Sequence, residues 1–181
     1  MRLPFRQRIR QQQIRDDPRE ARTVTMTAPI DGIGDTTTDD SADTQTDSTT
    51  RRVFAPVGEL IGFRRISSGE GEAVIELQSG PQHTNPMGTL HGGILCDIAD
   101  AAMGVAYAST LAPDESFTTL ELKINYLRPV WNATLRANGR VVQRGRTVGL
   151  VECDVYDEQQ RLVAHATSTC MTLRGEQAKG R

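Results

Sequence analysis

The sequence predicts an α+β fold in which an antiparallel β-sheet wraps around one long central α-helix. Three observations lead to this prediction. The segment from Gly92 to about Ser109 is rich in Ala, Ile, Leu and Met and is apolar on nearly every side, so a helix there needs cover all round. Several later segments carry apolar residues at every second position, which is the period of a strand. Short turns join these segments, and short turns favour antiparallel neighbours.

The other elements follow from local patterns. Pro56 suits the first position of a short helix or turn over residues 55–62. Two strands are expected over 63–67 and 72–78, because the glycines between them indicate a turn. A loop rich in Gly, Pro, Asn and His covers 80–90. After the helix, period-two patterns predict four strands, over 118–127, 134–144, 147–157 and 162–173.

The first strand after the helix has a marked alternation. Leu120, Leu122 and Ile124 share one face with Tyr126, and strict alternation places Thr119 on the opposite face. A sheet wrapped around a single helix also leaves an edge strand and an outer face without cover. Pairing with a second copy of the chain would cover them, so a homodimer is expected.

Composition divides the 181-residue chain near residue 52. Residues 1–22 carry seven Arg, residues 31–50 carry six Asp and seven Thr, and neither stretch has an apolar period. Such segments bury too little surface to offset chain entropy, so residues 1–52 are expected to form a disordered low-complexity tail. One folded domain is expected over 53–173, followed by a polar tail over 174–181 that frays.

Charge and cysteine content limit the function classes. The net charge of −2 argues against nucleic acid as a partner. No apolar run approaches the roughly 18 residues of a membrane span, so no membrane contact is expected. The three cysteines fit neither a disulfide framework nor a metal site, which predicts buried thiols in a reducing compartment and a cytoplasmic protein. The three histidines add no ligand set, so no metal is expected.

One block of sequence carries most of the functional information. It places Asn85, then His91, Gly92 and Gly93, then a helix with Asp100 nine residues after the histidine. Two glycines at a helix start leave backbone N–H groups uncovered, and such groups can bind a carbonyl oxygen or an oxyanion. A carboxylate in an apolar helix is costly to bury, so its presence suggests a reacting group. Acyl-transfer chemistry needs both features.

The spacing Asn-x-x-Gly-x-x-His-Gly-Gly, with Asp nine residues after His, resembles the hotdog-fold acyl-CoA thioesterases. The resemblance is greatest to the PaaI-like type, which includes the phenylacetate-pathway enzymes and human thioesterase superfamily member 2. The segment Leu-Glu-Leu-Lys-Ile-Asn-Tyr-Leu-Arg-Pro resembles that family's strand after the helix, and the whole resemblance covers residues 53–173. It implies a hotdog fold and hydrolysis of an aryl- or medium-chain acyl-CoA to free acid and CoA. Coenzyme A is then part of the substrate, and no separate cofactor is implied.

The same resemblance assigns roles to residues. Asp100 is the general base or the nucleophile, and Gly92 polarises the thioester carbonyl through its backbone N–H. His91 helps to hold the loop and the thioester, and Asn85 helps to orient the carbonyl or the attacking water. Thr119 assists from the following strand. The family usually builds its site between two subunits of a dimer, often paired into a tetramer, so Asp100 is expected to face Gly92 of a second copy.

Other interpretations stay open for these residues. One residue is inserted between helix and strand relative to the family, which leaves Thr118 as an alternative to Thr119. Asp97 is the rival to Asp100, although near the helix start it could simply complement the helix dipole. Asn85 could be only a turn residue, and His91 could anchor the loop without transferring a proton.

A second group of residues is considered for substrate binding. Three arginines suit the phosphates of coenzyme A, although solvated strand-end arginines are equally expected: Arg128, Arg144 and Arg146. Gly93 is expected to contact substrate beside Gly92. Trp131, the sole tryptophan, is interpreted as packing, and His83 and His165 as structural or surface residues. Four small helix residues leave room for an acyl group: Ala101, Ala102, Gly104 and Ala106.

Two other function classes compete with hydrolysis. A hotdog dehydratase or hydratase would act on acyl thioesters, but its usual His-Phe-Pro-Gly context is absent. A non-catalytic acyl-CoA-binding sensor would carry a helix-turn-helix before the hotdog, and residues 1–52 show no such periodicity. The acyl carrier, CoA or an acyl-carrier protein, is left open by the residues.

Overall fold

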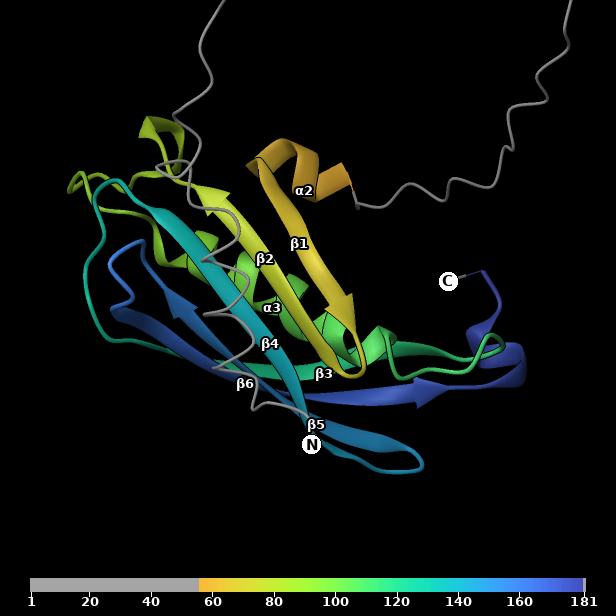
Figure 1. Ribbon diagram of the computed structural model, residues 1–181. Helices are drawn as coiled ribbons and strands as arrows, with labels where there is room; N and C mark the ends of the chain where they lie inside the picture. The colour runs from red at the N-terminus through yellow and green to blue at the C-terminus, as the bar shows by residue number, and fades with distance from the viewer. Residues whose placement is uncertain (1–55, 181) are drawn as a thin grey trace, which may run out of the picture. The chain divides into compact units, whose positions relative to one another are not determined.

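The structure is a computed structural model that describes residues 56–180, and there a six-stranded antiparallel sheet packs against one long helix (Figure 1). This confirms the α+β class predicted from the sequence. The disordered tail predicted over 1–52 lies outside the described residues.

The elements, in chain order, are α2 (Pro56–Ile61), β1 (Phe63–Gly69), β2 (Glu72–Gln78), the 3-10 turn η2 (Pro81–His83), α3 (Gly92–Ala108), β3 (Ser116–Tyr126), β4 (Thr134–Arg144), β5 (Val148–Tyr156), β6 (Leu162–Leu173) and the 3-10 turn η3 (Gly175–Ala178). Each helix and strand expected from the sequence is present, with ends that agree closely. The C-terminal tail, which was expected to fray, contains η3.

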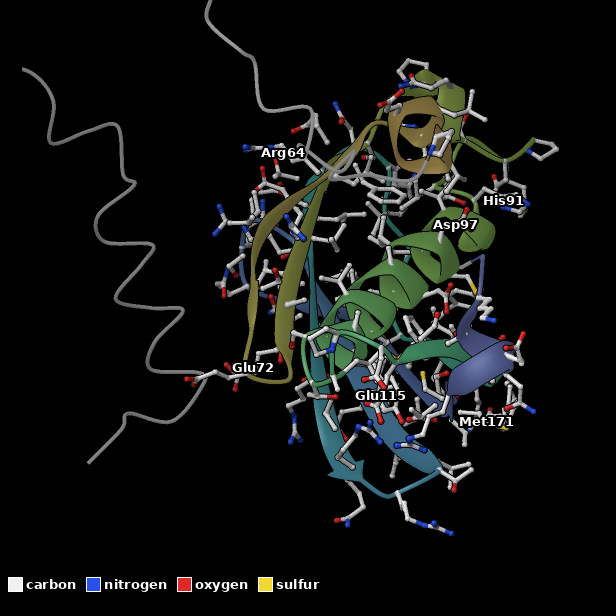
Figure 2. All side chains as sticks on the ribbon, turned by 90° about the vertical axis from the view of Figure 1, so that its right-hand side faces the viewer. Arg64, Glu72, His91, Asp97, Glu115 and Met171 are labelled. Atoms are coloured by element: carbon white, nitrogen blue, oxygen red, sulfur yellow. The ribbon has the colours of Figure 1, made fainter. Side chains whose placement is uncertain are left out.

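The strands follow the order β1-β2-β4-β5-β6-β3, with every neighbouring pair antiparallel. The two edge strands are therefore β1 and β3. Figure 2 shows the sheet passing from one side of α3, along β1 and β2, to the other side, along β6 and β3. The edge strand β3 is 11 residues long and contacts only β6 within the sheet.

The core lies between α3 and the inner face of the sheet. Ile98, Ala102 and Ala106 of α3 are fully buried there, against inward positions of β4 and β5 such as Ala137 and Val151. Gly139 on β4 allows this close packing. A Cβ atom at that position would lie 2.4 Å from the carbonyl oxygen of Ala102, so any side chain would displace the helix.

One side of α3 stays outside the sheet's cover. It is a stripe at helical spacing, made of Asp97, Asp100, Ala101, Gly104, Val105 and Ala108. These six residues are exposed or half-buried, whereas the sheet side of the helix is buried. The sheet therefore wraps around α3 as predicted but leaves one stripe of the helix uncovered in the single chain, and this stripe carries both aspartates.

The outer face of the sheet carries an ion-pair cluster centred on β2. Glu76 on β2 is paired across the strands with Arg64 on β1 and Arg136 on β4, and the long arginine side chains leave Glu76 only 7% exposed. The two guanidinium groups offset the energetic cost of burying the negative charge of this carboxylate.

Within residues 56–180, no helix has the length and apolar character needed to cross a membrane. In the same part of the chain, no group of three or more His, Cys, Asp or Glu side chains lies close enough together to hold a metal ion.

Candidate active site

The N-terminus of α3 presents a backbone donor. His91 caps the helix, with its Nδ1 accepting the N–H of Gly93 at 2.9 Å and its carbonyl accepting the N–H of Ile94 at 3.0 Å. Within the described residues, the N–H of Gly92 has no hydrogen-bond acceptor. Of the two glycines singled out in the sequence, Gly92 therefore keeps its donor available, while Gly93 uses its donor in the cap.

Tyr126 at the end of β3 holds this helix start. Its hydroxyl donates to the carbonyl of Gly92 at 3.1 Å. A Cβ atom on Gly92 would lie 2.9 Å from Cζ of Tyr126, so only glycine fits without moving the ring. A shallow hollow of about 390 Å³ lies at this point, and both residues line it. The sequence alone shows Tyr126 only as a member of an alternating strand.

Asn85 is engaged within its own loop. Its side-chain Nδ2 donates to Oγ1 of Thr89 at 2.8 Å, and its Oδ1 accepts the backbone N–H groups of Met87 and Thr89 at 2.9 and 3.2 Å. In the single chain, Asn85 thus fixes the loop that leads to α3. Within the described residues, the side-chain amide of Asn85 makes no hydrogen bond to Gly92.

His83 is a buried structural histidine, in agreement with its interpretation from the sequence. Its Nδ1 accepts the backbone N–H of Gly80 at 3.0 Å, so its Nε2 carries the proton that is donated to the carbonyl of Ile61 at 2.8 Å. His165 is paired with Asp154 on β5 at 2.8 Å.

Asp100 lines a second pocket, of about 350 Å³, over the uncovered stripe of α3. Besides Asp97, Asp100 and Thr119, its lining is apolar: Val57, Phe63, Ile75, Ala101, Gly104, Val105, Ala108 and Phe117. The hydroxyl of Thr119 reaches Oδ1 of Asp100 at 3.5 Å, the outer limit for a hydrogen bond. Of the four small residues expected to make room for an acyl group, Ala101 and Gly104 line this pocket, whereas Ala102 and Ala106 are buried against the sheet.

Thr119 lies on the helix side of β3, contrary to the strict alternation assumed from the sequence. The register between β3 and β6 shifts between Thr119 and Glu121, so Leu120 has no partner in β6 and is 52% exposed. This β-bulge changes which alternate residues face α3. Phe117 and Thr119 face the helix before the bulge, and Leu122 and Ile124 face it afterwards. Thr118 pairs with Met171 and does not line the pocket.

The two aspartates influence each other. Partial burial raises the pKa of Asp100, and the negative charge of Asp97 raises it further, while the hydrogen bond from Thr119 lowers it. Burial likewise raises the pKa of Asp97, and His91 opposes this increase. Figure 2 shows Asp97 and His91 near the same end of α3. A carboxylate with a raised pKa is a stronger base in its ionised form, which suits proton abstraction from water.

The N–H of Gly92 and the carboxylate of Asp100 lie far apart within one chain. Gly92 and Asp100 lie on the same helix, eight residues apart, which corresponds to about 12 Å along its axis. They also line different pockets. A single thioester group is too small to contact both from one chain.

The three candidate arginines lie in different places. Arg128 lines the hollow beside Gly92. Arg144 binds Glu115 at 3.2 Å and Oγ1 of Thr110 at 3.2 Å, beyond the opposite end of α3. Arg146 is exposed in the turn between β4 and β5. The structure therefore brings only Arg128 close to the helix start.

The comparisons with known proteins agree with a hotdog fold of the thioesterase type. Residues 87–164 match the model of the Thioesterase superfamily. A putative esterase of Saccharolobus solfataricus is 36% identical over 67% of this chain and 89% of its own length. A 1,4-dihydroxy-2-naphthoyl-CoA hydrolase of Listeria monocytogenes is 28% identical over 61% of this chain and 90% of its own length. The solved structure of the PaaI protein from the phenylacetic acid degradation operon of E. coli superposes with a TM-score of 0.61 at 28% identity, over 66% of this chain and 85% of that one.

This chain belongs to the thioesterase superfamily. The resemblance stated from the Asn-to-Asp motif is thereby confirmed, as is the hotdog fold.

Proposed function

We propose that this protein hydrolyses aryl- or medium-chain acyl-CoA thioesters to the free acid and CoA, with Asp100 and Gly92 as the central residues. The observation that carries the proposal is the state of Asp100. It is a carboxylate with a raised pKa, contacted by Thr119, in a pocket that is otherwise almost entirely apolar. Enzymes commonly raise the pKa of a catalytic carboxylate by partial burial and by a neighbouring charge.

The proposed site is shared between two copies of the chain. Asp100 of one copy faces Gly92 of the other, because the two groups are about 12 Å apart along one helix. Strand β3 supports this arrangement, since it is a long edge strand next to both pockets. Pairing of the β3 edges of two copies would satisfy the exposed backbone groups and bring the two helices together. A homodimer is the minimal active unit, and such dimers pair into a tetramer.

In the proposed reaction, the thioester carbonyl oxygen accepts the free N–H of Gly92. Asp100 removes a proton from water, and the resulting hydroxide attacks the carbonyl carbon. The tetrahedral oxyanion is stabilised by the Gly92 N–H, at about 10²–10³-fold per donor. The carbon–sulfur bond then breaks, and the CoA thiolate takes up the proton. In the alternative route, Asp100 attacks directly and water cleaves the resulting anhydride. Neither route uses a separate cofactor.

The acyl group is proposed to lie in the pocket lined by Asp100. Its lining of Val57, Phe63, Val105 and Phe117 suits an apolar chain or ring. The relative from Listeria monocytogenes is a 1,4-dihydroxy-2-naphthoyl-CoA hydrolase, which supports an acyl-CoA substrate. A cytoplasmic location is part of the proposal, since Cys96, Cys153 and Cys170 are unpaired thiols, as expected in a reducing compartment.

The test is release of free thiol from a panel of aryl and straight-chain acyl-CoAs, with wild type, Asp100→Asn and Asp97→Asn side by side. We expect wild type to release thiol, Asp100→Asn to lose about 10²-fold or more in turnover while still binding acyl-CoA, and Asp97→Asn to lose far less. Turnover at the wild-type level in Asp100→Asn would overturn the assignment of the base. Binding without turnover in wild type would favour the acyl-CoA sensor, and addition or loss of water across a double bond would identify a hydratase or dehydratase.

A further inference from the structure

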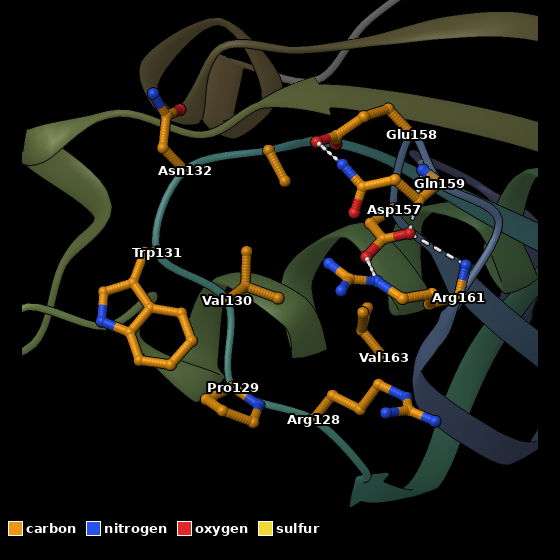
Figure 3. A pocket seen from close by; sticks show the side chains of 11 residues that line it. Arg128, Pro129, Val130, Trp131, Asn132, Asp157, Glu158, Gln159, Arg161 and Val163 are labelled. Atoms are coloured by element: carbon orange, nitrogen blue, oxygen red, sulfur yellow. Dashed lines mark hydrogen bonds and ion pairs between the residues drawn. The ribbon is translucent and has the colours of Figure 1, made fainter.

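The sole tryptophan of the chain, Trp131, is 62% exposed between β3 and β4. This contradicts the interpretation from the sequence that it serves in packing. Trp131 lines a pocket of about 320 Å³ between the β3–β4 segment and the β5–β6 turn (Figure 3). Tyr126 and Leu127 of the same segment are also about half exposed, so Trp131 belongs to a group of exposed apolar side chains, and such a group suggests a contact with a ligand.

The backbone that carries Trp131 is fixed. The N–H groups of Leu127 and Arg128 donate to the carbonyl of Val163, and the carbonyl of Val130 accepts the N–H of Leu90 at 2.7 Å. On the far side, the N–H of Ala133 donates to Oγ of Ser79 at 2.9 Å. The ring and the neighbouring side chains are thus presented on a rigid segment, which lowers the entropic cost of binding a ligand.

Both acidic groups of this pocket are hydrogen-bonded within the protein, but only Asp157 has a cationic partner. Asp157 is bound by Nε of Arg161 at 2.7 Å and by two backbone N–H groups, and Glu158 accepts the backbone N–H of Thr134 at 3.0 Å. Figure 3 shows the Asp157–Arg161 pair on the wall that faces the β3–β4 segment. Among residues 56–180, the guanidinium of Arg128 has no hydrogen-bond or ion-pair partner. The pocket therefore offers the unpaired cation of Arg128 and the aromatic face of Trp131, while Glu158 on the opposite wall keeps its negative charge.

This pocket adjoins the hollow beside Gly92. Arg128, Pro129 and Val130 line both it and the hollow that contains Gly92. A molecule that placed a carbonyl at Gly92 and extended along the segment from Tyr126 would reach Arg128 first and Trp131 next. The five residue steps from Tyr126 to Trp131 span at most about 16 Å.

We propose that this pocket binds the adenosine 3′-phosphate 5′-diphosphate portion of coenzyme A, and the inference rests on the proposed function. Arg128 contacts the phosphates, because guanidinium suits phosphate oxygens. Trp131 stacks on the adenine, because every base offers a π-face to an aromatic ring. The order of these groups along the chain matches the order from thioester to phosphates to adenine in an acyl-CoA. An acyl-carrier protein lacks adenine, so the pocket selects CoA as the acyl carrier.

Intrinsic fluorescence tests the proposal without any turnover. Because Trp131 is the only tryptophan, emission reports on this side chain alone. We expect adenosine 3′,5′-bisphosphate and CoA to quench it with saturation, and phosphopantetheine to leave it unchanged. Arg128→Gln should weaken binding of the bisphosphate about tenfold or more. Lys123→Gln, which removes one positive charge from the outer face of β3, is the matched control and should bind as wild type.

Kinetics give a second readout. Trp131→Ala should lower kcat/KM for an acyl-CoA about 5- to 100-fold, which corresponds to stacking of about 1–3 kcal/mol. It should leave kcat/KM for the matching acyl-pantetheine thioester unchanged, which also shows that the variant is folded. Trp131→Phe should retain most of the acyl-CoA activity.

The outcomes separate this inference from the proposed function. Turnover of acyl-CoA with no effect of Trp131→Ala, or CoA binding by calorimetry with constant emission, would overturn the nucleotide pocket and leave the thioesterase intact. Equal losses for acyl-CoA and acyl-pantetheine would also overturn it. Saturable quenching by adenosine 3′,5′-bisphosphate in a protein that hydrolyses no thioester would support the pocket and reject the thioesterase.

Discussion

Gly139→Ala is predicted to be strongly destabilising, because this glycine sets the distance between β4 and α3. A Cβ atom there would lie 2.4 Å from the carbonyl oxygen of Ala102, 2.5 Å from its carbonyl carbon and 2.8 Å from the nitrogen of Met103. All three atoms belong to the backbone of α3. No change of side-chain rotamer relieves the overlap, so the helix itself must move.

The size of the effect follows from this geometry. Ordinary van der Waals contact begins near 3.4 Å, so α3 must move away from the sheet by about 1 Å. Overpacking of a core costs typically about 1–3 kcal/mol, and displacement of a whole helix belongs at the upper end. We therefore expect the free energy of unfolding to fall by about 3 kcal/mol. For a chain of this size that lowers Tm by roughly 6–12 °C.

Urea denaturation and thermal melting measure the effect, with Gly104→Ala as the matched control on the uncovered stripe. There the added Cβ would lie 3.3 Å from Cζ of Phe117, the far end of a movable side chain, and alanine favours the helix by about 0.8–1 kcal/mol. Gly104→Ala should therefore be neutral or slightly stabilising. A Gly139→Ala variant within about 0.5 kcal/mol of wild type would refute the close approach of β4 and α3.

Three further predictions follow from the electrostatics and the buried hydrogen bonds. Since Asp100 must be ionised to act and its pKa is raised by burial and by Asp97, activity should fall as pH drops through a value above that of an ordinary Asp. Asp97→Asn should move this acid limb of the kcat/KM profile to lower pH, and an unmoved limb would contradict the coupling. Glu76→Gln removes the negative charge that Arg64 and Arg136 share. The free energy of unfolding, measured in urea, should fall by about 1–2 kcal/mol. An unchanged free energy would show that solvent screens both ion pairs. His83→Ala leaves two buried backbone groups without partners and should cost about 1–3 kcal/mol by the same assay; a smaller loss would mean that water replaces the ring.

The fold was predictable from the sequence because each element carries its own period. The alternation in β4, β5 and β6 and the long apolar run of α3 fix their type and, with the flanking turn residues, their ends. The register of β3 was not predictable in the same way. A bulge at Leu120 requires no glycine or proline, so the sequence contains no residue that indicates it. The bulge nevertheless places Thr119 on the face opposite to the one that strict alternation predicts.

The candidate site was predictable as a set of residues but not as an arrangement. The motif indicated Asp100 and Gly92, and helical geometry alone shows that they are about 12 Å apart along one axis. Helical phase would also have separated Ala101 and Gly104, which face the pocket, from Ala102 and Ala106, which face the sheet. The exposure of Trp131 has no local signal, because it depends on where the β5–β6 turn packs.

The central claim is that Asp100 of one copy acts with Gly92 of another, and subunit mixing tests it most directly. Asp100→Asn removes the base. Gly92→Pro removes the N–H at a first helical position, where proline is tolerated once Tyr126 moves aside. Each variant alone should be inactive. After unfolding and refolding together, about half of the dimers are mixed and each has one intact site of two, so about a quarter of wild-type thiol release should return. If both variants are folded dimers and the mixture stays inactive, the base and the donor act within one chain, and the shared site is wrong.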